Sequence, residues 1–150
     1  MRLIANLNSQ SRRPRTLVYA LVALGLQPAA QATAPQTGIA GRWINPSRSV
    51  IIDIAPCGAA LCGTVKWASA KAKADASAGT ARLVGTRLLT GLRRQGSQWQ
   101  GKLFVPDRNL HVEGRIERAA PGQLKVSGCA LGGLVCDSQL WTRARGKLKP

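Results

Sequence analysis

The sequence has few of the side chains that carry out catalysis or bind metals. Its 150 residues include one histidine, His111, and six acidic residues, and neither a phosphate-binding glycine loop nor a cluster with metal-ligand spacing occurs. His111 could act as a general base if Glu113 or Asp107 held its ring beside a pocket. The alternating charges around it are more typical of a solvated strand. We therefore expect a protein that is not an enzyme and that needs no metal or cofactor.

Aromatic residues and negative charges are also scarce. Phe, Trp and Tyr make up 4% of the chain, and 22 Lys and Arg face the six acids, for a formal net charge of +16. Such an imbalance attracts anionic surfaces such as lipid head groups, although it is equally typical of a plain solvated basic surface. Nucleic-acid sites usually combine basic side chains with exposed aromatics, so a nucleic-acid partner is not expected.

The chain contains no apolar run long enough to span a bilayer. The apolar segment 16–27 follows a basic stretch that ends at Arg15 and precedes a small-x-small site, Ala30-Gln31-Ala32. This order predicts a signal peptide over residues 1–32, with general secretory and twin-arginine export both open and an uncleaved anchor as the alternative. We expect a periplasmic or secreted protein without a transmembrane anchor.

Four cysteines occur as two local pairs, Cys57 with Cys62 and Cys129 with Cys136. In an exported chain such pairs predict disulfides, and the local connectivity is favoured among the three possible because each pair flanks a glycine-containing turn. A four-thiolate zinc site is the alternative, but the usual two-residue spacings are missing.

Helical periodicity is absent, and apolar and polar residues instead alternate along most of the chain. This pattern predicts an all-β fold, a small up-and-down antiparallel barrel of about eight strands. A flexible segment 33–40 would precede a barrel domain at 41–146, and a basic tail at 147–150 would follow it. Residues 69–81 lack the pattern and could form a short helix, a mobile flap over one mouth or a surface loop. The expected strands are 41–44, 49–55, 62–68, 83–92, 97–105, 108–118, 122–129 and 138–145.

Gly41-Arg42-Trp43 opens this series of strands and Trp141-Thr142-Arg143 closes it. The first and last strands of a closed barrel are neighbours, so a Trp of one and an Arg of the other can stack at its end. The presence of these two motifs at the ends of the strand series therefore favours a closed barrel.

Several short motifs occur in the order typical of an uncharacterised family. They include Cys57-Gly58, Leu83-Val84-Gly85, Trp99-Gln100-Gly101-Lys102, Val105-Pro106-Asp107 and Ser127-Gly128-Cys129. Together with the motifs at 41–43 and 141–143, they resemble the domain of unknown function 2147 family, small exported bacterial proteins with a lipocalin-like barrel. The resemblance implies that Trp43 and Arg143 form the structural pair of the lipocalin fold.

The lipocalin-like resemblance implies a binder or carrier of a small hydrophobic or anionic amphipathic ligand. The candidate wall residues are Trp67, Trp99, Leu103, Val112 and Val126, together with Trp43. The alternative is a protein-binding or inhibitor module whose barrel is filled by its own side chains. The apolar loop between Cys129 and Cys136 favours it if Leu134 is exposed, whereas a buried Leu134 would make the loop a lid.

Overall fold

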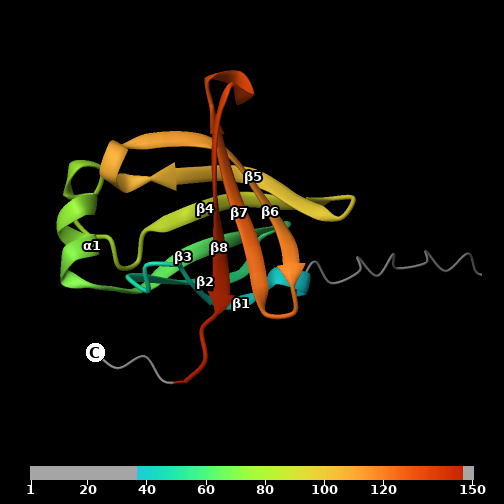
Figure 1. Ribbon diagram of the computed structural model, residues 1–150, viewed down its shortest axis with the longest axis horizontal. Coiled ribbons are helices and arrows are strands. Elements are labelled where there is room, and N and C mark those ends of the chain that lie inside the picture. Colours follow the sequence, from blue (N-terminus) through green and yellow to red (C-terminus); the bar gives the residue numbers. More distant parts are fainter. Residues whose placement is uncertain (1–36, 147–150) are drawn as a thin grey trace, which may run out of the picture. The chain divides into compact units, whose positions relative to one another are not determined.

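The computed structural model describes residues 37–146 as a closed antiparallel barrel of eight strands in which each strand pairs with the next and the last with the first (Figure 1). The predicted all-β, eight-stranded fold is thus confirmed. The predicted signal peptide, residues 33–36 and the tail 147–150 lie outside the described residues. The strands are β1 (Gly41–Ile44), β2 (Val50–Cys57), β3 (Ala60–Ala68), β4 (Arg87–Gln95), β5 (Gln98–Val105), β6 (Leu110–Ala120), β7 (Gln123–Ala130) and β8 (Val135–Arg143).

Strand ends differ from the predicted ones where local turns intervene. β4 begins at Arg87 rather than at residue 83, because Leu83 is buried in a turn in which the Thr86 N–H donates to the Leu83 carbonyl at 3.0 Å. β8 begins three residues earlier than expected, since the hairpin that it forms with β7 continues up to Val135.

The two ends of the barrel are built from different connections. Two-residue turns join β2 to β3, β4 to β5 and β6 to β7 at one end, and Gly58, Gly96 and Gly122 give them their positive φ angles. We call this the closed end. The other end, the open end, carries the longer connections 45–49, 69–86, 106–109 and 131–134.

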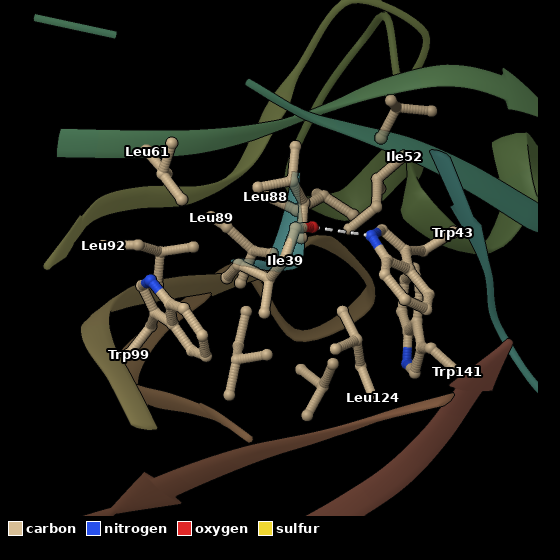
Figure 2. Packing of buried hydrophobic residues seen from close by; sticks show 14 of the residues in the cluster. Ile39, Trp43, Ile52, Leu61, Leu88, Leu89, Leu92, Trp99, Leu124 and Trp141 are labelled. Atoms are coloured by element: carbon tan, nitrogen blue, oxygen red, sulfur yellow. Dashed lines mark hydrogen bonds between the residues drawn. The ribbon is translucent and has the colours of Figure 1, made fainter. Parts of the chain in front are cut away.

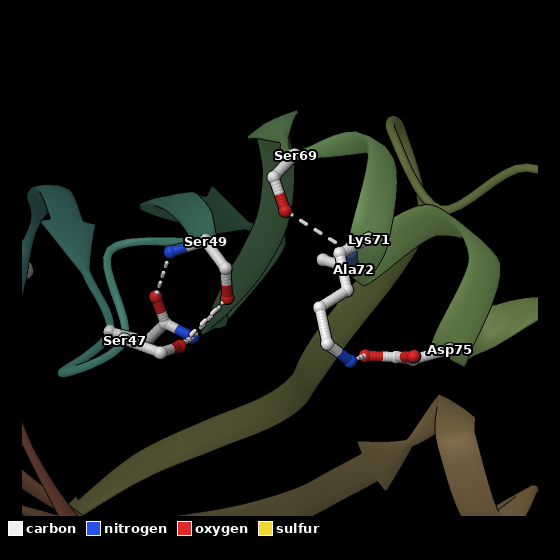
Figure 3. A network of polar contacts seen from close by, with 7 residues as sticks. Ser47, Ser49, Ser69, Lys71, Ala72 and Asp75 are labelled. Carbon is white, nitrogen blue, oxygen red and sulfur yellow. Dashed lines mark hydrogen bonds and ion pairs between the residues drawn. The ribbon is translucent and has the colours of Figure 1, made fainter.

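The segment without strand periodicity forms a short helix at the open end, one of the alternatives that the sequence left open. α1 (Ala70–Asp75) begins after Ser69, whose hydroxyl accepts from the Ala72 N–H at 3.1 Å (Figure 3). The turn η2 (Ala76–Ala78) continues it and buries Ala76. The neighbouring β1–β2 loop is held by Asn45, whose side-chain carbonyl accepts from the Ser49 N–H at 2.8 Å.

The interior of the closed end is filled in part by the residues just before β1. The turn η1 (Thr37–Ile39) places Ile39 in the core with no exposed surface, and the Trp43 indole N–H donates to the Ile39 carbonyl at 2.8 Å (Figure 2). The barrel's packed core thus includes Ile39, which lies before the predicted domain boundary at Gly41. No helix among residues 37–146 has the length and apolarity that a membrane crossing requires.

Arg143 closes the barrel over Trp43. Its guanidinium lies 4.3 Å from the centroid of the Trp43 ring and donates to the Ala40 carbonyl at 2.8 Å. Gly41 makes room for it, because a β-carbon there would lie 2.1 Å from Arg143 Nη1 and the φ of +115° also disfavours a side chain. The expected Trp–Arg pair is thus present, and its geometry gives the physical reason for Gly41 in the Gly-x-Trp motif.

Candidate functional site: a cavity at the open end of the barrel

A cavity of about 400 Å³ occupies the open end of the barrel. Its walls are largely apolar, and it lies above the buried cluster, with which it shares Leu88, Val126 and Trp141. These three side chains therefore form the boundary between the filled and the hollow parts of the interior. The other apolar lining residues are Val50, Leu103, Phe104, Val105, Pro106, Leu110, Val112, Ala130 and Val135.

Three of the predicted wall residues line this cavity together. Leu103 of β5 lies opposite Val112 of β6, and Val126 of β7 is buried beside them. Gly128 leaves space here, because a β-carbon would lie 2.9 Å from Leu103 Cδ2 and 3.0 Å from Val112 Cγ2. The β5–β6–β7 wall of the cavity thus depends on the lack of a side chain at Gly128 as well as on the apolar side chains around it.

Trp67 was predicted to point inward with Val65, but the structure turns it away. A β-bulge shifts the register between β2 and β3, so that Val65 pairs with Ile52 while Trp67 pairs with Ile51. Lys66 is the extra residue, and side chains that directly oppose each other share a face. Since Ile52 points into the barrel, Ile51 and Trp67 point to the opposite face, where Ile51 is covered to 8% exposure and Trp67 stays partly exposed.

Trp99 points inward as predicted but lies at the closed end and does not line the cavity. It is 2% exposed and packs under η1, where a β-carbon on Gly38 would lie 3.1 Å from its ring. The Arg94 guanidinium lies 5.5 Å from the ring centroid. The indole N–H of Trp99 is the buried side-chain polar group without a hydrogen-bond partner among the described residues. Trp43 and Trp99 therefore fill the closed end.

Trp141 is the principal cavity residue that the wall prediction missed. It is 9% exposed, and its indole N–H donates to Gln139 Oε1 at 3.2 Å. Trp141 precedes Arg143 by two residues and so shares its face of β8. That spacing is the signal that could have identified it, since Arg143 packs over the inward-facing Trp43.

The polar groups of the cavity carry charges of both signs. Asp107 and Asp137 line it together with Arg108, and the Arg108 guanidinium lies 4.0 Å from the Asp107 carboxylate. The Asp137 carboxylate accepts from the Ser138 N–H at 2.7 Å. The charged groups of the lining are thus two carboxylates and one guanidinium, and the guanidinium lies close to the Asp107 carboxylate.

His111 lies outside the cavity lining. Its ring stacks on Phe104 at 4.5 Å between centroids, and the side chain is exposed on the open-end part of β6. Among residues 37–146, His, Cys, Asp and Glu side chains do not gather in groups of three or more that could hold a metal ion. The four cysteines form the two expected local disulfides, Cys57–Cys62 and Cys129–Cys136.

The β7–β8 hairpin projects from the barrel at the open end (Figure 1). Its tip is apolar and exposed: Leu134 is 86% and Leu131 is 74% accessible. The loop between Cys129 and Cys136 is therefore not a lid buried over the mouth. In the described part of the chain, the large exposed hydrophobic residues are Leu110, Leu131, Leu134, Val135 and Leu140, of which all but Leu110 belong to this hairpin.

Comparison with known proteins gives one match. Neither a curated protein nor a solved structure matches the chain. A family model described as an uncharacterised protein conserved in bacteria, DUF2147, matches residues 41–143, which run from the first residue of β1 to the last of β8. The matched region contains both disulfides, the Trp43–Arg143 pair and all lining residues of the cavity. The chain therefore belongs to the DUF2147 family.

Proposed function

We propose that this protein binds a small, mainly apolar molecule in the cavity at the open end of its barrel. The observation that supports this most strongly is the contrast within one interior. Side chains fill the closed end completely enough to bury Trp43 and Trp99, whereas about 400 Å³ stays free beyond Trp141. Ligand sites are typically cavities of roughly this size with apolar walls and a few polar groups at the rim.

The charges at the mouth favour a neutral ligand over an anionic amphiphile. Asp107 and Asp137 both line the cavity, and the neighbouring Arg108 is engaged by Asp107. A carboxylate or phosphate head group placed there would face two like charges. The strongly basic composition acts on the outer surface and at long range, so it does not determine what the cavity accepts.

Binding of a neutral fluorescent probe, N-phenyl-1-naphthylamine, tests the proposal. We expect the wild-type protein to bind it with an increase in fluorescence, and Leu103→Trp to weaken binding at least tenfold because the larger ring occupies the cavity. Leu134→Trp is the matched control, since Leu134 is exposed and lies outside the lining. Equal binding by both variants, or no binding by the wild type while a thermal melt shows a folded protein, would contradict the proposal.

We further propose that the protein is exported and acts without catalysis. The two disulfides support an oxidising compartment. The ring of His111 is stacked on the lining residue Phe104 but is not itself part of the cavity lining. Recovery of the mature chain, cut after Ala32, from the periplasm or medium tests the first part. Recovery of uncut protein from the cytoplasm would refute it.

A protein-binding module is the second candidate function. The observation that favours it is the exposure of Leu131 and Leu134 on a hairpin tip that its own disulfide pins. Exposed apolar side chains gathered in one place are typical of partner surfaces. The double variant Leu131→Ser, Leu134→Ser would separate the two functions, because it should abolish partner binding and leave probe binding unchanged.

A further inference from the structure

The two strands that close the barrel, β8 and β1, are paired over a short length only. β8 pairs with β7 over eight residue pairs, from Gln123 with Thr142 to Ala130 with Val135, but with β1 over two, Trp43 with Arg143 and Ile44 with Thr142. β1 ends at Ile44 and the chain turns away into the loop 45–49. In the part of the chain that the structure describes, no strand lies beside residues 135–141 on that side of β8.

Two hydrogen bonds determine which backbone groups of β8 point to this free edge. The Arg143 N–H donates to the Gly122 carbonyl at 2.9 Å, on the β7 side, and the Ala144 N–H donates to the Arg42 carbonyl at 3.0 Å, on the β1 side. Successive residues of a strand direct their N–H and C=O groups to opposite sides. The N–H and C=O groups of Cys136, Ser138 and Leu140 therefore point to the free edge.

Asp137 is the one feature of this edge that opposes pairing with another strand, because its carboxylate accepts from the Ser138 N–H at 2.7 Å. Edge strands usually carry lysine, proline or a bulge that discourages association. Residues 135–142 contain neither Lys, Arg nor Pro, and Asp137 is their single charge. Leu140 and Val135 are about half exposed or more. In a chain with 22 Lys and Arg, this is a segment where a second copy can approach without opposing positive charges at the contact.

We propose that a second copy of this chain pairs antiparallel with β8 along this edge, with Ser138 on the twofold axis. A twofold axis perpendicular to the sheet requires that paired residues share a face, so their numbers differ by an even count. With Ser138 opposite Ser138 of the partner subunit, Cys136 pairs with the partner's Leu140. The edge-facing backbone groups of Cys136, Ser138 and Leu140 are then all hydrogen bonded across the interface, and the Ser138 N–H exchanges its bond to its own Asp137 carboxylate for one to the partner strand.

The side chains agree with this register. Asp137 lies opposite Gln139 of the partner subunit, which can donate to the carboxylate. The neighbouring register would put Asp137 opposite itself, with two carboxylates in contact. The shift in the other direction would need Thr142, which is already paired with Ile44. Of these three registers, the one centred on Ser138 pairs Cys136, Ser138 and Leu140 across the interface and keeps the two Asp137 carboxylates from lying opposite each other.

The pairing also extends the cavity. Val135, Asp137, Gln139 and Trp141 face it from β8. In the proposed register, Val135 of the partner subunit lies beside Trp141, so the second copy adds an apolar side chain to the cavity wall. Dimer formation along β8 does not depend on ligand binding, so a dimer that binds no probe would still support the proposed pairing.

Sedimentation analysis of the mature chain with and without Ser138→Pro tests the proposal. Proline removes the Ser138 N–H, which points to the free edge, and leaves the hydrogen bonds to β7 in place. We expect the wild type and the control Ser138→Ala to have twice the mass of one chain, and Ser138→Pro to have the mass of one. A monomeric wild type at millimolar concentration, or a dimeric Ser138→Pro, would overturn the proposal.

Single cysteines at positions 137, 138 and 139 test the register even if the proline variant does not fold. A residue on the twofold axis lies close enough to its counterpart for a disulfide. We expect Ser138→Cys to cross-link under mild oxidation, and Asp137→Cys and Gln139→Cys to cross-link far less. Ser127→Cys, on the adjacent strand β7, controls for random oxidation. Equal cross-linking at all four positions would refute the register.

Salt gives an independent check on the same interface. Two copies with a large positive net charge repel each other, and added salt screens this repulsion. We expect the dimer to dissociate less as ionic strength rises. A dimer that weakens with salt would indicate an interface made of ion pairs, which the β8 edge cannot supply, and would contradict the proposal.

Discussion

The two ends of this barrel are made from the same alternating strands, yet they differ in nearly every physical property. At the closed end, tight turns bring the strands together, η1 plugs the interior and Trp43 and Trp99 are buried. At the open end, longer loops keep the strands apart and Trp141 and Leu103 border a cavity. Whether an inward side chain belongs to the core or to the cavity wall therefore depends on how far it lies from the closed end.

The largest expected difference in stability is between variants that lack a tryptophan at the closed end and at the open end. Trp43→Ala should lower the free energy of unfolding by about 3–5 kcal/mol, because it removes a buried ring, the partner of Ile39 and the surface under Arg143. Trp141→Ala should cost roughly half as much, since water can enter the space beside the cavity. Urea unfolding followed by circular dichroism measures both, and equal losses would remove the distinction between the ends.

A matched pair of leucines tests the same difference between the two ends. Leu92 is fully buried at the closed end, and Leu103 is half-buried at the cavity. Leu92→Ala should destabilise the protein by about 2–5 kcal/mol, whereas Leu103→Ala should cost about 1 kcal/mol because the site is already hollow. Thermal and urea unfolding of both variants checks this order. A costlier Leu103→Ala would mean that the cavity is closed in solution.

The third expected effect, smaller than the losses at Trp43 and Leu92, concerns the Arg143 contact at the closed end. Arg143→Ala should lower stability by about 1–3 kcal/mol, through loss of the stacking on Trp43 and of the hydrogen bond to the Ala40 carbonyl. Arg143→Lys should recover part of that loss, because it keeps the charge but not the planar group. An unchanged melting curve for Arg143→Ala would show that the short β1–β8 pairing closes the barrel without this contact.

Most of the fold could be predicted because it is recorded in local patterns. Period-two alternation located the strands, glycines marked the turns, and the spacing of the cysteines indicated both disulfides. The Trp43–Arg143 pair followed from the family resemblance and from the position of the two motifs at the ends of the strand series.

The cavity could be predicted only in part, because its residues depend on features without a local signal. Alternation places Trp67 on the inner face, and only the pairing register shows that Lys66 forms a bulge and reverses it. Alternation correctly places Trp99 inside the barrel but does not show how close it lies to either end. Trp99 lies at the closed end, where it packs against η1. The free edge of β8 arises from the different lengths of β1 and β8, which matter only once the two strands are paired.

Nuclear magnetic resonance of the four tryptophan indole N–H groups during titration with N-phenyl-1-naphthylamine can establish whether the probe enters the cavity at the open end and leaves the closed end untouched. Trp141 reports on the cavity, Trp43 and Trp99 on the closed end, and Trp67 on the outer face. We expect the Trp141 signal to shift to saturation while the signals of Trp43, Trp99 and Trp67 stay in place. A Trp141 signal that does not move, or a Trp99 signal that moves as far, would contradict this expectation.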